Sequence, residues 1–261
     1  MWTREELKRK AKMFLKTHYL PAFFVSFVLM IVTGSGGNFR NENKISHDPA
    51  LYINNAEFNP DAFWHVAGPI VGIGALVFVA LILLRIFIGY ILEVGARNYF
   101  LRGTEREVTV SEMAFGFNSE YYGNIVKTMF IKGLYNLLWF LLLIIPGIIK
   151  AYAYSMVPYI LADNPNIDSD RAIELSIKMT GNQKWDMFVL DLSFIGWYLL
   201  GSLLFGIGTW FVNPYVDATK AQLYSKLRLN AVRSNLCTPE ELCFKPDEDV
   251  YGDSENWYDQ Y

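Results

Sequence analysis

The chain has 261 residues, of which 52% are hydrophobic and 16% aromatic, and its formal net charge is −3. That charge averages a basic beginning and an acidic end, and no basic stripe with interleaved aromatic residues is present, so we expect no nucleic-acid partner. The two cysteines, Cys237 and Cys243, lie in the polar C-terminal part and do not predict a disulfide framework.

The apolar residues are gathered into uncharged blocks rather than spread in amphipathic patterns. Residues 19–33 and 66–84 contain no charged side chain. A helix of about 20 apolar residues spans the hydrocarbon core of a bilayer, which is about 30 Å thick. Several such blocks in one chain predict an all-α, polytopic membrane protein.

The first 18 residues predict a basic amphipathic helix. Thr3 and Glu6 have the spacing of a capping box, which marks a helix start. Such a helix either lies on an anionic membrane surface or packs on its own protein, and both interpretations stay open. The apolar face carries Leu7, Ala11, Phe14 and Leu15, and basic side chains crowd the rest.

The blocks that follow predict a six-helix membrane domain, residues 19–230, built from three hairpins. A polar loop separates the first two spans, and amphipathic, interfacial segments lead into the later hairpins. The acidic residues 231–261 predict a disordered tail. The predicted spans are residues 19–33, 66–93, 124–145, 147–162, 187–204 and 209–226.

Two glycine-containing turns are predicted to join the helices of the second and third hairpins. Pro146-Gly147 follows a full span, and proline disfavours continuation of a helix while glycine permits a tight turn. Gly206–Gly208 has the same role in the third hairpin. Pro158 is predicted to kink the helix that returns from the first of these turns.

The distribution of basic residues predicts the orientation of the chain in the membrane. Under the six-span topology, 17 of the 23 lysine and arginine residues flank the spans on one side. The opposite side has Arg40 and Lys44, with Lys150 at its border. Because basic residues accumulate on the cytoplasmic side, both termini are expected in the cytoplasm.

Ionisable residues inside the spans form a candidate polar network. Glu93 and Arg97 have the spacing of a direct helical pair, and Lys132 and Asp191 are expected at comparable depth and to neutralise each other. Such residues either line a polar cavity open to the cytoplasm or join helices and extend toward the interface, and both interpretations stay open. The candidate network is Arg85, Glu93, Arg97, Lys132, Asp191 and Asp217.

Catalytic and metal-binding motifs are not recognised. His18, His47 and His65 are dispersed, and none has a metal-ligand partner at helical spacing. The sequence contains neither a P-loop nor a G-x-S-x-G motif. We therefore expect no cofactor and no enzymatic activity.

Residues 124–201 and the motif VNPYVDATKAQLYSKLR resemble an uncharacterised family of bacterial integral membrane proteins, catalogued as domain of unknown function 975. The N-terminal REELKRKAKMFLKTHYLPAFFVS is similar to the opening pattern of the same family. The chain also looks like a distant relative of the membrane domain attached to some glycerophosphodiester phosphodiesterases. That domain is not the catalytic one, so the resemblance implies a plasma-membrane location and carries over no catalytic residue.

The leading hypothesis is a non-enzymatic accessory, binding or scaffold protein of the bacterial plasma membrane. The expected partners are membrane lipids and another membrane protein bound through the acidic tail. One alternative is a small transporter or export factor with a polar intramembrane path. The other is a membrane enzyme that acts on lipid through dispersed residues.

Overall fold

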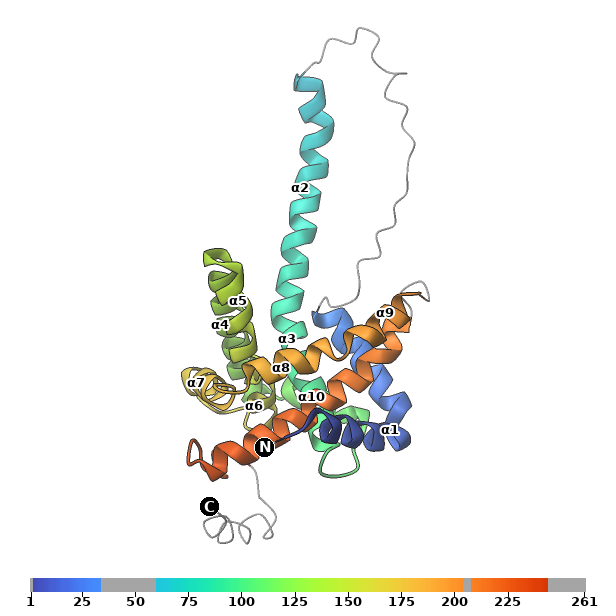
Figure 1. Cartoon of the computed structure of the whole chain (residues 1–261). Coiled ribbons are helices and arrows are strands. Elements are labelled where there is room, and N and C mark those ends of the chain that lie inside the picture. The colour runs from blue at the N-terminus through green and yellow to red at the C-terminus, as the bar shows by residue number, and fades with distance from the viewer. Residues whose placement is uncertain (1, 34–59, 204–207, 244–261) are drawn as a thin grey trace, which may run out of the picture.

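The computed structural model describes residues 2–33, 60–203 and 208–243 (Figure 1). Within these ranges the regular elements are all helices, and no strand occurs, so the predicted all-α class is confirmed. The elements are α1 (Arg4–Thr33), α2 (Pro60–Leu84), the π-helix η2 (Arg85–Gly89), α3 (Tyr90–Arg102), the 3-10 helix η3 (Val110–Phe117), α4 (Ser119–Leu142), α5 (Ile144–Ala153), α6 (Val157–Asp163), α7 (Ser169–Met179), α8 (Lys184–Leu192), α9 (Ile195–Leu203) and α10 (Gly208–Arg233).

The helices have the length and surface of a polytopic membrane protein. Large apolar side chains are exposed along α2, α4, α5 and α9, as expected of surfaces that contact lipid. The sixth predicted span, in α10, does not reach the same apolar composition, so the span count stays a prediction. Among the described residues, five segments are long and apolar enough to cross a membrane: Arg4–Thr33, Val71–Arg102, Ser119–Leu142, Ile144–Asp163 and Lys184–Leu203.

The N-terminal helix packs on the protein itself. Helix α1 is divided by a kink at His18 (φ −118°, ψ 26°), which separates its basic half from its apolar half. Leu7, Ala11 and Leu15 on the basic half are buried in the common core, and α1 contacts α3 and α10. Of the two interpretations for this segment, the structure supports packing on its own protein, with Arg4, Arg9, Lys12 and Lys16 exposed.

A continuous helical rod runs from Pro60 to Arg102 through α2, η2 and α3, and α2 extends away from the other helices (Figure 1). Its lower part, α3, lies at the centre of the fold and contacts α1, α6, α10 and η3. The contact with η3 depends on Gly95. A Cβ atom at Gly95 would lie only 1.9 Å from the backbone carbonyl oxygen of Met113.

The turn between α4 and α5 lies at Leu143, so the prediction that Pro146-Gly147 forms the tip of this hairpin is wrong by three residues. Leu143 is extended (φ −159°, ψ 143°) and reverses the chain. Pro146 then falls in the first turn of α5, where backbone N–H groups have no intrahelical partner and proline is tolerated. Gly147 lets the two helices meet, because a Cβ there would lie 2.7 Å from Phe140 Cδ1.

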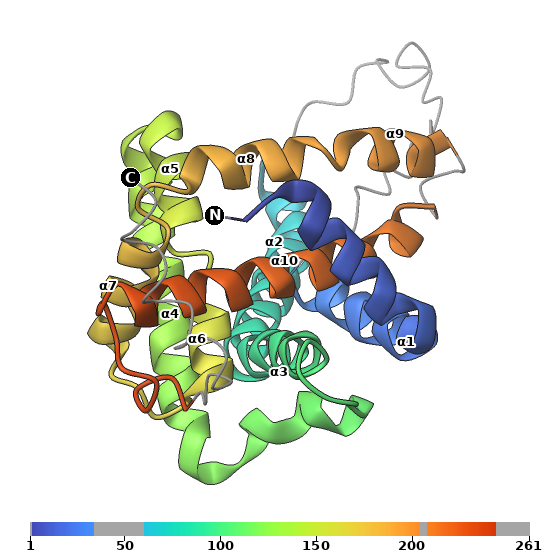
Figure 2. The same ribbon diagram turned by 60° about the horizontal axis from the view of Figure 1, so that its bottom comes forward.

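Two predicted spans are each divided into two helices. The chain leaves α5 after Ala153 and enters α6 at Val157, so the break precedes Pro158, which lies in the first turn of α6. Helices α8 and α9 follow each other nearly in line along one side of the bundle (Figure 2). The predicted turn at Gly206–Gly208 lies largely outside the described residues, but Gly201 and Gly208 pack backbone to backbone.

The segment after α10 is folded up to Cys243, which differs from the prediction of a disordered tail beginning at residue 231. Leu242 is fully buried, and Asn164 Nδ2 donates a hydrogen bond to the backbone oxygen of Glu241. Arg171 Nε lies 2.6 Å from Glu241 Oε1, and this guanidinium lowers the pKa of the glutamate. Residues 34–59 and 244–261, which include most of the predicted loop and tail, lie outside the described residues.

Candidate functional site

A cavity of about 240 Å³ lies between α3, α4, α5, α6, α8 and α10. Four of the six predicted network residues line it: Glu93, Arg97, Lys132 and Asp191. These residues come from three helices that are distant in sequence, and the fold brings their charged ends to one space. The other polar residues of the lining are Asn136, Tyr152, Ser155, Tyr159 and Lys220.

Glu93 forms the buried floor of this cavity. It accepts a hydrogen bond of 2.8 Å from Arg85 Nη2, and its other oxygen lies 3.6 Å from Lys132 Nζ. Arg85 reaches it along the helix because Gly89 leaves room, since a Cβ at Gly89 would lie 2.8 Å from Arg85 Nη1. The predicted pair between Glu93 and Arg97 is therefore wrong, and the π-helical turn at Arg85–Gly89 supplies the partner instead.

Arg97 bridges α3 to α6 and α10. Its Nη1 donates to Asp217 Oδ1 at 2.8 Å and to Tyr159 Oη at 3.2 Å. Ser26 Oγ on α1 donates to the second oxygen of Asp217 at 2.6 Å. A second cavity, of about 120 Å³ between α1, α3, α9 and α10, is also lined by Arg97 and Lys220, so these two side chains stand between the two spaces.

Asp191 forms the rim of the larger cavity. It lies 3.2 Å from Lys220 Nζ and accepts a hydrogen bond of 3.0 Å from Tyr152 Oη. The Asp191 and Lys220 side chains are 33% and 36% exposed, whereas Lys132 is 16% exposed. The predicted pair between Lys132 and Asp191 is wrong, because Lys132 faces α3 while Asp191 faces α10.

Residues 139–231 match the family model described as Protein of unknown function (DUF975). The match covers 93 of the 261 residues, and this part of the chain is similar to the DUF975 family. No curated protein and no solved structure matches the chain. The predicted likeness to the membrane domain of glycerophosphodiester phosphodiesterases is not tested by these comparisons and stays a prediction.

The cavity is formed jointly by the DUF975 segment and the residues that precede it. Tyr152, Tyr159 and the Asp191–Lys220 pair lie within the DUF975 segment, whereas the floor residues come from α3 and the first part of α4. The predicted network includes neither Lys220 nor Tyr152. The only available signal for Lys220 is its position three residues after Asp217, almost one helical turn away.

A second polar cluster, which sequence reasoning also missed, lies outside the cavity. Asp163 at the end of α6 is 3% exposed, and Arg228 of α10 is 2% exposed. Arg228 Nη1 donates to Asp163 Oδ1 at 2.9 Å, and Tyr224 Oη donates to Asp163 Oδ2 at 2.7 Å. Glu105 accepts from the same guanidinium. We call Asp163, Arg228, Tyr224 and Glu105 the buried clamp.

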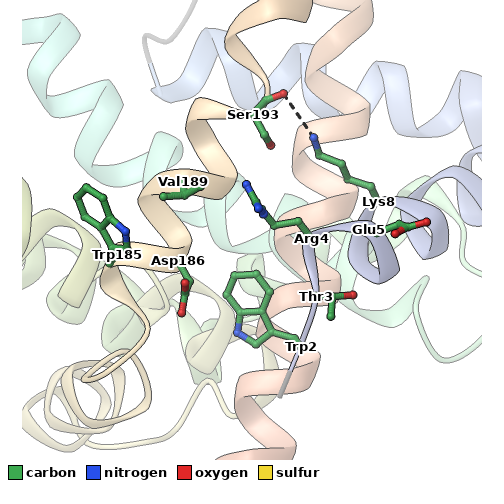
Figure 3. Close-up of a pocket in the computed structure, with 9 residues that line it drawn as sticks. All are labelled: Trp2, Thr3, Arg4, Glu5, Lys8, Trp185, Asp186, Val189 and Ser193. Atoms are coloured by element: carbon green, nitrogen blue, oxygen red, sulfur yellow. Dashed lines mark hydrogen bonds between the residues drawn. The ribbon is translucent and has the colours of Figure 1, made fainter.

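A wider groove of about 740 Å³ lies between the N-terminal residues of the chain and α8 (Figure 3). The Lys8 side chain crosses this groove. Its Nζ lies 3.4 Å from the backbone oxygen of Ser193 and 4.4 Å from the centre of the Phe194 ring. Its lining holds as many acidic as basic residues, Glu5 and Asp186 against Arg4 and Lys8. Charged side chains converge on the cavity of about 240 Å³ around Glu93, so that cavity is a stronger candidate site than this groove.

The described residues offer no preformed metal centre. Within residues 2–33, 60–203 and 208–243, no three His, Cys, Asp or Glu side chains are grouped so that they could hold a metal ion. The lining of the candidate site itself consists of charged, hydrogen-bonding and apolar side chains.

Proposed function

We propose that this protein is a non-enzymatic binding protein of the bacterial plasma membrane, with both termini in the cytoplasm. In this proposal the cavity around Glu93, Arg97 and Lys132 holds a small polar molecule or a lipid headgroup. The main support for this proposal is that charged side chains from separate helices converge on one cavity. Removing an ion from water costs several kcal/mol even after relaxation, so such a grouping is expensive to maintain.

The unpaired polar groups at the cavity support a binding role. Arg97 Nε and Asn136 Oδ1 belong to residues that line the cavity, and both atoms are buried without a hydrogen-bond partner in the described part of the chain. Groups that served only to join helices would be expected to satisfy one another, since an unpaired buried polar group costs about 1–3 kcal/mol.

The size of the cavity limits the ligand. Pockets for drug-sized ligands occupy about 300–1,000 Å³. The cavity has about 240 Å³ and would hold about eight water molecules at roughly 30 Å³ each. A small ion or one lipid headgroup fits this volume, whereas a peptide does not.

The second cavity favours a transporter as the alternative function. Arg97 and Lys220 line both spaces, so movement of these side chains would join the larger cavity to the smaller one near α1 and α9. A polar path through the helices would then continue past the Arg97–Asp217 ion pair. Uptake of the co-purified molecule into protein-containing vesicles would distinguish this alternative from simple binding.

Co-purification tests the binding proposal. The full chain is extracted into native nanodiscs from its own membrane, and the bound molecules are identified by native mass spectrometry. We expect a stoichiometric lipid or small molecule on the wild type and about tenfold lower occupancy on Lys132→Met. A hydrogen bond to a charged group contributes about 1.5–3 kcal/mol, and 1.4 kcal/mol is a factor of ten in affinity.

Lys127→Met is the matched control, because Lys127 is an exposed lysine on the same helix. It should retain the ligand like the wild type. An empty wild-type protein, or equal losses in Lys127→Met and Lys132→Met, would contradict the proposal. A stoichiometric protein partner in place of a ligand would support a scaffold role instead.

A further inference from the structure

We propose that the ligand of this cavity has a net charge of −1 carried on oxygen, as in the headgroup of an anionic lipid or in dihydrogen phosphate. This inference rests on the proposed binding function and adds the chemical class of the ligand. Three observations support an anionic ligand: the charge balance of the cavity, its unpaired hydrogen-bonding groups and the arrangement of its cations.

The charged residues of the cavity do not balance. The lining contains three cations, Arg97, Lys132 and Lys220, and two anions, Glu93 and Asp191. Their direct ion-pair partners are Arg85, bound to Glu93, and Asp217, bound to Arg97. Adding this cation and this anion leaves the excess at one positive charge. An uncompensated charge in a membrane protein is costly, and one negative charge on a ligand would remove the excess.

The unpaired hydrogen-bonding groups point to the same chemistry. Arg97 lines the cavity, and its Nε is a buried donor without an acceptor in the described residues. A guanidinium group can only donate, so this position requires an acceptor oxygen. Asn136 Oδ1 is an unpartnered acceptor in this region, and a 180° rotation of its amide would place its two N–H donors there instead. With the amide in that orientation the network is short of acceptors, which an oxyanion supplies.

The cations are arranged from the rim to the floor of the cavity. The Lys220 side chain is 36% exposed, whereas Arg97 and Lys132 are 15% and 16% exposed. An anion entering from the rim would meet Lys220 first and the two deeper cations next. Asp191 competes for Lys220, because its carboxylate lies 3.2 Å from Lys220 Nζ.

This arrangement gives two substitutions with opposite expected effects. Lys220→Met removes a cation from the rim and should lower anion occupancy by about tenfold, since 1.4 kcal/mol of a charged hydrogen bond corresponds to that factor. Asp191→Asn changes the charge by the same amount in the other direction and frees Lys220. It should raise anion occupancy. A purely structural pair would give losses in both variants.

The test uses the purified full chain in two parallel arms. In the first, nanodiscs contain equal amounts of phosphatidylglycerol and phosphatidylcholine, and native mass spectrometry identifies the retained lipid. In the second, nanodiscs of phosphatidylcholine alone are titrated with inorganic phosphate in a calorimeter. We expect about tenfold enrichment of phosphatidylglycerol if the anion is a headgroup, or saturable phosphate binding if the anion is soluble, with the opposite shifts in Lys220→Met and Asp191→Asn.

The outcomes separate this inference from the binding function on which it rests. Retention of phosphatidylcholine or of an uncharged molecule would overturn the anionic ligand and leave the binding function standing. Equal losses in both variants would overturn the electrostatic argument in the same way. A protein that is empty in both arms and after native extraction would overturn the binding function itself.

Discussion

Gly95→Ala is expected to prevent accumulation of the folded protein. The added Cβ would lie 1.9 Å from the carbonyl oxygen and 2.7 Å from the carbonyl carbon of Met113. Backbone atoms cannot rotate away as a side chain can, so η3 would have to leave α3. Overpacking of a core typically costs about 1–3 kcal/mol, and a backbone clash of this kind lies at or above the upper end.

The measurement is the yield of monodisperse protein in detergent, followed by thermal unfolding of what remains. Gly123→Ala is the control, because no atom lies within 4 Å of the added Cβ and alanine favours a helix by about 1 kcal/mol over glycine. A Gly95→Ala protein with wild-type yield and melting temperature would show that α3 and η3 do not pack as described.

Arg228→Met is expected to lower the free energy of unfolding by about 3–5 kcal/mol. The substitution leaves the Asp163 side chain, which has no exposed surface, without its guanidinium partner. Replacing both residues by apolar ones removes the buried charges together, so Asp163→Leu combined with Arg228→Met should recover much of the loss. Unfolding in denaturant of the two single variants and the double variant measures these differences.

Arg106→Met provides the comparison with an exposed pair. Arg106 lies 2.7 Å from Glu112, but its side chain is 56% exposed, so we expect a change of only about 0–1 kcal/mol. Equal effects of Arg106→Met and Arg228→Met would mean that the clamp is solvated and contributes little to stability.

The helical class and the membrane location follow from the composition, because uncharged apolar blocks have few other stable structures. The pairing of charges does not follow from it. Spacing placed Glu93 with Arg97 and depth placed Lys132 with Asp191. Instead, Lys132 pairs with Glu93 of α3, and Arg97 and Asp191 pair with residues of α10, because helix neighbours are set by tertiary packing. The π-helical turn that joins Arg85 to Glu93 has no distinct sequence signal apart from Gly89.

The position of the turn after α4 and the contacts of the buried clamp also could not be predicted from the sequence. Pro146-Gly147 is a strong turn signal, yet proline suits the first turn of a helix as well as its end, and the reversal falls at Leu143. Asp163 and Arg228 are 65 residues apart in the chain, so no local pattern connects them. Four charged residues of the candidate site, Glu93, Arg97, Lys132 and Asp191, could be predicted from the sequence, whereas Lys220 and the contacts among these residues could not.

Water access to the cavity tests the central claim most directly. Ser155 lines the cavity, and Ser155→Cys in a Cys243→Ser background places one reactive thiol there. Cys237 should stay unmodified, since burial raises the pKa of its thiol to about 11 and the thiolate is the reactive form. Leu199→Cys, at an exposed position on apolar α9, is the control for a thiol that faces lipid.

We predict that a small, water-soluble thiol reagent modifies the protein with Ser155→Cys and leaves the one with Leu199→Cys unmodified in membranes. Because the cavity carries an excess positive charge, a negatively charged reagent should react faster than a positively charged one of the same size. We expect a ratio of about tenfold, which corresponds to a difference of about 1.4 kcal/mol in interaction energy between the two reagents. No modification at position 155 in folded protein, or faster reaction with the positively charged reagent, would contradict a cavity that binds an anion.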